Sequence, residues 1–172
     1  LSYRGNQDST GSDTITITAD DLGNSGKCPQ PDPDPPLADP CSLTDTKAVA
    51  VTVNGVNDAP VLNVPGAQSA TEETPETIAG IGVVDVDAGS GQLQVTLSAS
   101  SGSLTLSTTG DLTFSAGDGS GDASMTFTGT LSNINTALAN LVYLGNKDFD
   151  SSDTITITVN DQGNSGLGPA QS

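Results

Sequence analysis

The two ends of the chain carry nearly the same sequence, and this internal repeat limits the fold more than any other feature. Leu1–Gly26 aligns without a gap with Leu141–Gly166, and 17 of the 26 aligned positions are identical. The offset is 140 residues (141 minus 1), so the 172-residue chain holds one period and an overlap of 32 (172 minus 140). Self-similarity at a fixed offset is typical of successive modules. We expect residues 1–56 to be the C-terminal part of one repeat and residues 57–172 to be the next repeat, which lacks its final strand.

Both modules are predicted to be all-β. Apolar and polar residues alternate in segments such as Ile15–Thr18 and Leu104–Leu106, the pattern of half-buried strands. Turn residues recur roughly every 8 to 12 positions, as in β-sandwiches. The predicted strands cover residues 47–53, 61–64, 68–71, 76–86, 93–98, 102–107, 112–115, 123–128, 141–143 and 153–160. Because no counterpart of 47–53 follows in the second module, we expect that module to expose an apolar groove and an unpaired sheet edge.

One segment departs from the strand pattern and predicts a short helix. Its apolar residues at helical spacing are Leu131, Ile134, Leu138 and Leu141. Thr130 or Ser132 can cap the N-terminus, and Asn140 can end the helix. We expect two to three turns that cross from one sheet of the sandwich to the other.

Composition excludes several classes of function. The chain has 21 acidic and 4 basic residues, a net charge of −17. Nucleic-acid binding needs clustered Lys and Arg, so it is excluded, whereas divalent cations would relieve the self-repulsion. No apolar run reaches the roughly 20 residues of a membrane span, and no signal peptide is recognisable. The absence of an initial Met indicates a fragment or a processed product.

Cys28 and Cys41 flank a segment rich in Pro and Asp. Without His, two thiols cannot form a four-ligand zinc site within one chain. A disulfide is the preferred interpretation in an extracellular context, and two unpaired thiols are the alternative. The proline-rich segment between them favours an extended conformation. It is expected to be a stiff surface loop, with a partner-binding segment as the alternative.

Five motifs together resemble the bacterial cadherin-like repeats of giant surface proteins, including RTX-type adhesins. They are Asn57–Pro60, Thr71–Pro75, Asp85–Gly89, the helical segment Leu131–Leu141 and Ser152–Thr158. The resemblance implies Greek-key, immunoglobulin-like or cadherin-like β-sandwiches strung end to end, with Ca²⁺ at the linkers and an extracellular location at a cell surface, in a fibre or in a biofilm matrix. The long Cys28–Cys41 insertion departs from the family pattern.

The residues themselves also favour a calcium site. Asp85 and Asp87 point to the same side if their segment is extended, and Gly89 allows a sharp turn around an ion. Asn57 and Asp58 add an amide and a carboxylate. By the resemblance, these four residues share one site. The same resemblance places Glu73, with Glu72 as the alternative, near the opposite linker.

Other acidic residues are weaker candidates for metal ligands. Asp21 and Asp161 occupy matched positions in the repeat and join the predicted ligand set. Turn chemistry is the preferred explanation of such residues, because Asp and Asn side chains bond their own backbone. For the remaining loop carboxylates turn chemistry is preferred; these are Asp118, Asp122, Asp148 and Asp150.

These features predict a non-catalytic extracellular module for structure or adhesion, an extender or fibre-building repeat stiffened by calcium. Its expected partners are neighbouring copies of the same repeat, head to tail, with possible completion by strand donation from an adjacent repeat or subunit. The alternative is a calcium-dependent module that binds a ligand or sugar. Catalysis is not expected, because the sequence has no His, no Gly-x-Ser-x-Gly elbow and no carboxylate pair in a predicted cleft.

Overall fold

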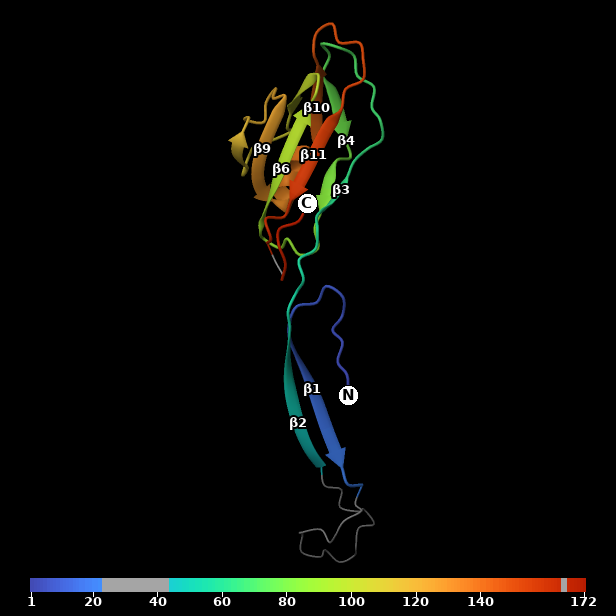
Figure 1. Ribbon diagram of the computed structural model, residues 1–172, viewed down its shortest axis with the longest axis vertical. Helices are drawn as coiled ribbons and strands as arrows, with labels where there is room; N and C mark the ends of the chain where they lie inside the picture. Colours follow the sequence, from blue (N-terminus) through green and yellow to red (C-terminus); the bar gives the residue numbers. More distant parts are fainter. Residues whose placement is uncertain (23–43, 165–166) are drawn as a thin grey trace, which may run out of the picture. The chain divides into compact units, whose positions relative to one another are not determined.

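The computed structural model describes residues 1–22, 44–164 and 167–172. The chain divides into two compact units, Leu1–Asn54 (unit 1) and Gly55–Ser172 (unit 2). Each unit is described by itself below (Figure 1). In the described part of the chain, no helix is long and apolar enough to cross a membrane.

Unit 1 contains a pair of long antiparallel strands, β1 (Gly11–Asp20) and β2 (Thr44–Val53). Their register runs from Gly11 opposite Val53 to Asp20 opposite Thr44. Because side chains alternate along a strand, the apolar residues Ile15, Ile17 and Val49 share one face. Ile17 and Val49 remain about half exposed, at 48% and 49%. A two-stranded ribbon with so little burial is marginally stable.

Unit 2 is an all-β, sandwich-like domain with one short helix, as the sequence predicted. A four-stranded sheet has the order β11-β6-β9-β8, a three-stranded sheet has the order β4-β10-β7, and β3 pairs with β5. The bounds are β3 (Val61–Asn63), β4 (Glu76–Ala79), β5 (Gly82–Val84), β6 (Gln92–Ala99), β7 (Gly102–Thr105), β8 (Thr113–Ala116), β9 (Ser124–Thr130), β10 (Asn140–Gly145) and β11 (Ile155–Asn160). All named strand pairs are antiparallel.

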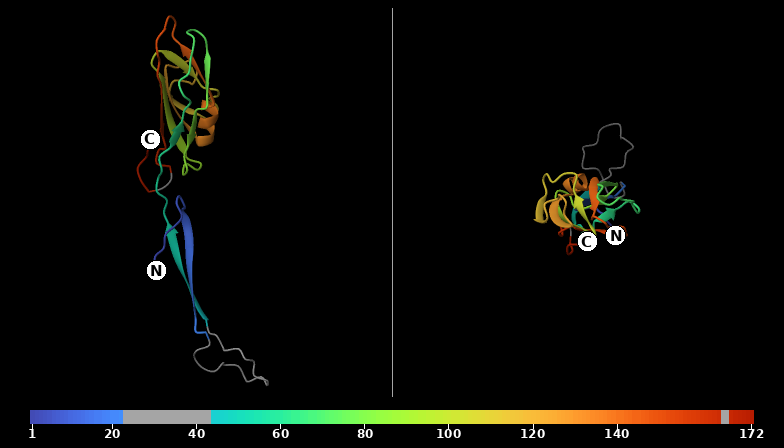
Figure 2. Two further views of the ribbon diagram at one scale, coloured as in Figure 1. Left: turned by 90° about the vertical axis from the view of Figure 1, so that its right-hand side faces the viewer. Right: turned by 90° about the horizontal axis from the view of Figure 1, so that it is seen from above.

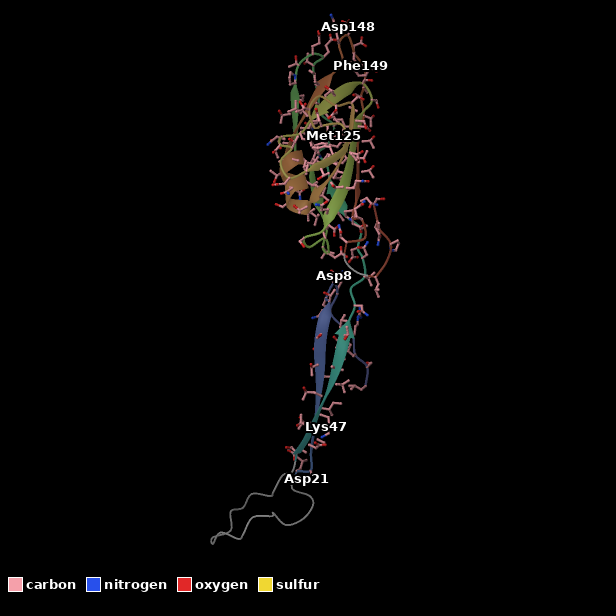
Figure 3. All side chains as sticks on the ribbon, turned by 90° about the vertical axis from the view of Figure 1, so that its left-hand side faces the viewer. Asp8, Asp21, Lys47, Met125, Asp148 and Phe149 are labelled. Carbon is pink, nitrogen blue, oxygen red and sulfur yellow. The ribbon has the colours of Figure 1, made fainter. Side chains whose placement is uncertain are left out.

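The core lies between the two larger sheets and beneath the helix. Alternate residues of β6 and β9 are fully buried, including Leu97, Met125 and Phe127. Phe127 packs against Phe114, with ring centroids 5.4 Å apart. Figure 3 shows Met125 among the strands of unit 2, whereas Asp148 and Phe149 lie in the loop after β10. Aliphatic side chains therefore supply most of this core, as the low aromatic content predicts.

The helix α1 (Leu131–Leu138) leads from β9 in one sheet to β10 in the other, which confirms the predicted crossover. Thr130 is the N-cap, and its hydroxyl accepts a hydrogen bond from the Asn133 amide at 3.4 Å. Figure 2 shows α1 (orange) against the strands of unit 2. From this helix, Asn135 bonds both backbone groups of Val83 in β5, accepting from its N–H at 2.7 Å and donating to its carbonyl at 2.9 Å.

One predicted strand is absent, and several others differ in extent. Residues 68–71 form no strand. The predicted strand 76–86 is divided into β4 and β5, because Gly80 adopts a φ of +86° that interrupts the extended backbone. The predicted strand 153–160 begins only at Ile155, because the Asp153 carboxylate bonds nearby backbone amides and ends the pairing there.

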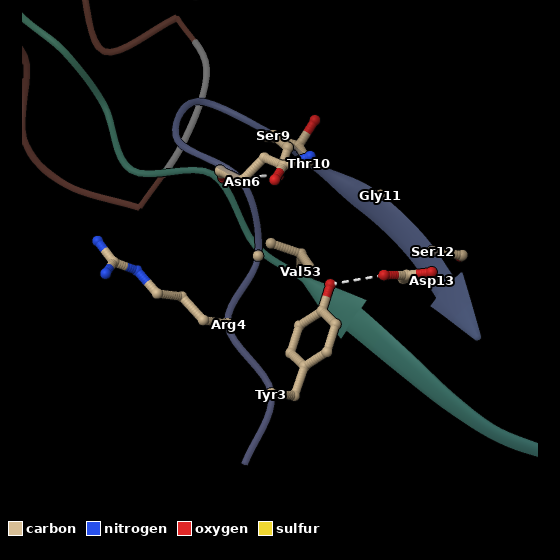
Figure 4. A pocket seen from close by; sticks show the side chains of 10 residues that line it. Tyr3, Arg4, Asn6, Ser9, Thr10, Gly11, Ser12, Asp13 and Val53 are labelled. Atoms are coloured by element: carbon tan, nitrogen blue, oxygen red, sulfur yellow. Dashed lines mark hydrogen bonds between the residues drawn. The ribbon is translucent and has the colours of Figure 1, made fainter. Parts of the chain in front are cut away.

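The repeated sequence produces the same local geometry in both units. The Tyr3 hydroxyl donates to Asp13 Oδ2 at 2.8 Å (Figure 4), beside a hollow of about 230 Å³ in unit 1. The Tyr143 hydroxyl donates to Asp153 Oδ2, also at 2.8 Å. Asp8 and Asp148, 140 positions apart, both have positive φ, at 57° and 58°. The sequence of this segment therefore determines its local structure in either setting.

Candidate functional site: an oxygen-rich cluster at the start of unit 2

Five oxygen-bearing residues gather where the chain enters unit 2, and we call them the Asn57 cluster. They are Asn57, Asp58, Asp85, Asp87 and Asp161. The segment after β5 is held to the entering chain by the Asp58 amide, which donates to Asp87 Oδ2 at 3.0 Å. All five were predicted as metal ligands from sequence, and the structure brings them onto three adjacent segments.

Asn57 is buried, with 2% of its surface exposed, and its amide orientation is fixed by two acceptors. Its Nδ2 donates to Asp161 Oδ2 at 2.5 Å and to the Pro169 carbonyl at 3.1 Å. Both amide hydrogens are therefore used, and Oδ1 is the acceptor atom of the side chain that is left. Within the described residues, this buried Oδ1 has no hydrogen-bond partner.

Asp85 holds the turn that follows β5. Its Oδ1 accepts from the Asp87 amide at 3.1 Å and from the Ala88 amide at 3.0 Å, while Gly89 takes a positive φ of 52°. Burial raises the pKa of Asp85, and the adjacent Asp87 carboxyl raises it further, although the two backbone bonds act in the opposite direction. Its buried Oδ2 has no partner in the part of the chain that the structure describes.

Asp161 is 1% exposed and is surrounded by donors. Besides Asn57, the amides of Gly163 and Gln171 donate to its Oδ1 at 2.9 and 2.6 Å. Burial alone would raise the pKa of Asp161, but the hydrogen bonds from Gln171, Gly163 and Asn57 together hold it below its ordinary value. Asp161 is therefore an ionised, well-bonded support for the cluster.

The chemistry of these atoms suits a hard cation. Buried polar atoms are nearly always hydrogen-bonded, so two unpartnered acceptor oxygens, Asn57 Oδ1 and Asp85 Oδ2, require a donor or a positive charge. Carboxylate and amide oxygens are the ligands of Ca²⁺. As the side chains stand, however, no group of three or more His, Cys, Asp and Glu residues in the described ranges is close enough to hold an ion. Ca²⁺ binding would therefore require the carboxylates of the cluster to move closer together.

The other predicted ligands do not join this cluster. Glu73 lies in an exposed turn between β3 and β4, with φ of 54°, and its neighbour Glu72 lies beside Gly145 at the end of β10. Asp21 belongs to unit 1. Asp118 and Asp122 form a turn of their own, in which the Asp122 carboxylate accepts the amides of residues 118 and 119. The Cys28–Cys41 disulfide lies outside the described residues and stays a prediction.

Sequence reasoning missed two residues of the cluster's surroundings. Gln171 donates its side-chain amide to the Asn57 carbonyl at 2.6 Å, and its backbone carbonyl accepts the Asp161 amide at 3.0 Å. Pro169 supplies the second acceptor for Asn57. The contacts of both residues with Asn57 join positions more than 100 residues apart along the chain, and neither residue has a pattern that would identify it.

With this geometry in view, the chain was compared with known proteins. The family model of the GEX2 domain, described as "Protein GAMETE EXPRESSED 2 domain", matches residues 78–167. The match covers 90 of the 172 residues (167 minus 78, plus 1), which is more than half of the chain. The chain belongs to the GEX2 domain family. No curated protein and no solved structure matched it.

The GEX2 match shows that the resemblance to bacterial cadherin-like repeats of RTX-type adhesins was wrong. It therefore also removes the cadherin-like and biofilm descriptions. The GEX2 region extends from β4 to the segment after β11, so it includes Asp85–Gly89, the α1 helix and Ser152–Thr158, but not Asn57–Pro60 or Thr71–Pro75. Short motifs rich in Asp and Asn form the turns of β-sandwiches, and unrelated families contain the same turns. Such motifs therefore do not distinguish one β-sandwich family from another.

Proposed function

We propose that this GEX2 domain chain is a non-catalytic, extracellular structural module that binds Ca²⁺ through the Asn57 cluster and uses the ion to stiffen its boundary segment. The single observation behind the proposal is the pair of buried, unpartnered oxygens, Asn57 Oδ1 and Asp85 Oδ2. The family description names a gamete-expressed protein and states no activity. The proposal therefore depends on this chain's own residues.

The electrostatics of the cluster support a cation. Asp85 is buried beside Asp87, and both effects disfavour its ionised form. A divalent ion would reverse this balance, because it favours the carboxylate and offsets the like charge of Asp87. The net charge of −17 adds a long-range attraction for cations.

The position of the cluster in the chain connects binding to a mechanical role. Asn57 and Asp58 lie three and four residues after Asn54, the last residue of unit 1. An ion that joined them to the Asp85–Gly89 turn would restrain the first residues of unit 2. We therefore expect calcium to reduce the conformational freedom of residues 55–58, which is the behaviour required of an extender module.

Titration calorimetry of the full chain with CaCl₂ tests the proposal. We expect binding in the range of about 0.1 to 1 mM, as for extracellular calcium modules, and weaker binding of Mg²⁺. Asp85→Asn should weaken calcium binding by about tenfold or more, because it removes one charged ligand. Glu73→Gln is the matched control, since Glu73 lies outside the cluster, and it should bind as the parent chain does.

Two further measurements separate the outcomes. Calcium at about 100 times its dissociation constant should stabilise the chain by about 2.7 kcal/mol against unfolding, and EDTA should remove this effect. X-ray scattering should show less flexibility between the units with calcium than with EDTA. If calorimetry shows no binding and EDTA leaves the melting temperature unchanged, buried water satisfies the two oxygens and the proposal is wrong. Glycan binding that disappears with EDTA would favour the ligand-binding alternative.

A further inference from the structure

The outer edge of β11 is open. In the four-stranded sheet β11 pairs with β6 on one side, and no strand in the described ranges pairs with its other side. A groove of about 940 Å³ runs beside this edge. Its lining includes the aliphatic side chains Leu62, Ile78, Ile81, Ile155 and Ile157. An unpaired edge next to an apolar groove is a ready template for another strand.

Unit 1 contains a copy of this edge with its partner in place. Residues 12–18 of β1 are identical to residues 152–158, which include the first half of β11. In unit 1, β1 pairs with β2, with Ile15 opposite Val49 and Ile17 opposite Lys47. When each β1 residue is replaced by its counterpart 140 positions later, Val49 lies opposite Ile155 and Lys47 lies opposite Ile157.

We propose that the outer edge of β11 accepts the β2 strand, Thr44–Val53, of a second copy of this chain, antiparallel and in the register of the β1–β2 pair. In that register Val49 and Val51 lie on the face of Ile155 and Ile157, which pack against the core of unit 2. The alternate residues Ala48 and Ala50 lie on the opposite face with Thr154 and Thr156. The apolar residues Val49 and Val51 therefore match the core-side face of the acceptor, whereas Lys47, opposite Ile157 on the same face, has to extend its charged end to solvent.

The backbone of β11 is oriented for this pairing. The Ala99 amide of β6 donates to the Ala123 carbonyl, on the side of β9. Alternate residues of a strand direct their backbone groups to opposite sides, so residues 98, 96 and 94 of β6 face β11. Their partners are residues 156, 158 and 160. The backbone groups of Ile155 and Ile157 therefore point to the open edge.

The exchange moves β2 between two acceptors that share the sequence of residues 12–18 and 152–158, and pairing along β11 replaces the pairing with the corresponding residues of β1. It adds burial, because Val49 is 49% exposed beside β1 and would enter the groove beside β11. Two copies at −17 each repel one another, so association should strengthen with added salt. This inference rests on the proposed structural role of the chain and names a second copy of the chain as its partner. It does not involve the calcium site.

A fluorescent peptide with the sequence of residues 44–53, titrated with the full chain and followed by anisotropy, tests the acceptor edge. We expect saturable binding. Val49→Asp in the peptide should weaken binding by about tenfold or more, because it would bury a charge in the groove. Ala50→Asp changes the opposite face and should bind nearly as the unmodified peptide. If the unmodified peptide does not bind the chain, the edge of β11 is not an acceptor site. If Val49→Asp and Ala50→Asp weaken peptide binding equally, the proposed register is wrong.

Sedimentation velocity of the full chain over a range of concentrations tests the donor. We expect mass to increase with concentration and with salt, to fall in the Val49→Asp chain, and to be maintained in the Ala50→Asp chain. A chain that binds the peptide but stays monomeric at every concentration overturns the second copy as donor. Association that persists in EDTA, together with calorimetry that shows no calcium binding, would support this inference and refute the calcium proposal.

Discussion

Replacing Asp153 with Ala is expected to destabilise unit 2 far more than the equivalent change in unit 1. The Asp153 carboxylate accepts the amides of Ser100, Ser101 and Thr154 at 3.0, 2.9 and 2.6 Å, and the Tyr143 hydroxyl at 2.8 Å. It thereby joins the turn between β6 and β7 to the strand that begins at Ile155. Asp13 makes the Tyr3 and Thr14 bonds, and no bond to a counterpart of the Ser100–Ser101 turn is seen among the described residues.

The expected magnitude follows from those bonds. Hydrogen bonds to a charged group contribute a net of about 1.5 to 3 kcal/mol each when they are buried, and Asp153 is only partly buried. Allowing for solvent at the exposed bonds, Asp153→Ala should reduce the free energy of unfolding by about 2 to 4 kcal/mol. With an m-value of about 2 kcal/mol per molar urea, the midpoint should fall by about 1 to 2 M. Asp13→Ala, at a fully exposed site, should leave the midpoint of unit 2 unchanged.

Urea unfolding followed by tyrosine fluorescence measures this difference. The chain has two Tyr and no Trp, so a Tyr3→Phe background leaves Tyr143 as its single reporter, inside unit 2. Far-UV circular dichroism on the same samples checks that the transition is cooperative. If the midpoint of Asp153→Ala lies within error of that of Asp13→Ala, the four bonds of Asp153 do not stabilise unit 2, and the argument fails.

The same residue has a defined pH dependence. Burial, the largest influence, would raise the pKa of Asp153, but the bonds from Tyr143, Ser101, Thr154 and Ser100 together hold it below its ordinary value. A carboxyl with a lowered folded pKa contributes stability above its unfolded pKa of about 3.9, and this contribution is lost as the pH falls through the folded pKa. The difference between the parent chain and Asp153→Ala should therefore shrink in acid. Burial and the bond to Asp153 also raise the pKa of Tyr143 to about 12.

Two other substitutions test the site and the fold. Asp85 has a raised folded pKa, so in EDTA its own contribution to stability should fall as the pH rises above about 3.9, and Asp85→Asn should lack this contribution. The difference in urea midpoint between the parent chain and Asp85→Asn should therefore change between pH 3.5 and pH 7, with the parent relatively less stable at pH 7, and a difference that stays constant would contradict the burial argument. Asn135→Leu leaves the buried N–H and carbonyl of Val83 without partners, so the free energy of unfolding should fall by about 2 to 3 kcal/mol. Thr136→Ala, on the exposed face of α1, is the control. If the two substitutions lower the free energy of unfolding equally, the two bonds of Asn135 do not stabilise unit 2.

The sequence predicted the parts of this fold that depend on local pattern. Alternation in Ile15–Thr18 and in 153–160 identified strands, and the spacing of Leu131, Ile134 and Leu138 identified α1 with its Thr130 cap. The strand predicted at 68–71 failed because the apolar content there is low and burial decides strand formation at such positions. The break between β4 and β5 at Gly80 was not predicted, because the positive φ of this residue is visible only in the structure.

The candidate site divides in the same way. Asp85, Asp87 and Gly89 could be named together from their spacing in the sequence. Their grouping with Asn57 and Asp58 depended on the family resemblance that the GEX2 match overturns. Contacts that depend on long-range packing could not be predicted, such as the bonds that join Asn57 to Pro169 and Gln171. Family membership was also misjudged, since turn motifs reflect backbone geometry and the GEX2 match depends on the whole of residues 78–167.

The recurring Tyr–Asp bond has a consequence for the order of folding. In both units it closes a loop of ten residues, from Tyr3 to Asp13 and from Tyr143 to Asp153. In unit 1 it forms beside only the β1–β2 ribbon, so a complete sandwich is not needed for it. Loops of this length close in about 10 to 100 ns, much faster than strands distant in sequence can meet. We expect this loop to be among the first native contacts that each newly synthesised repeat makes, before its two sheets meet.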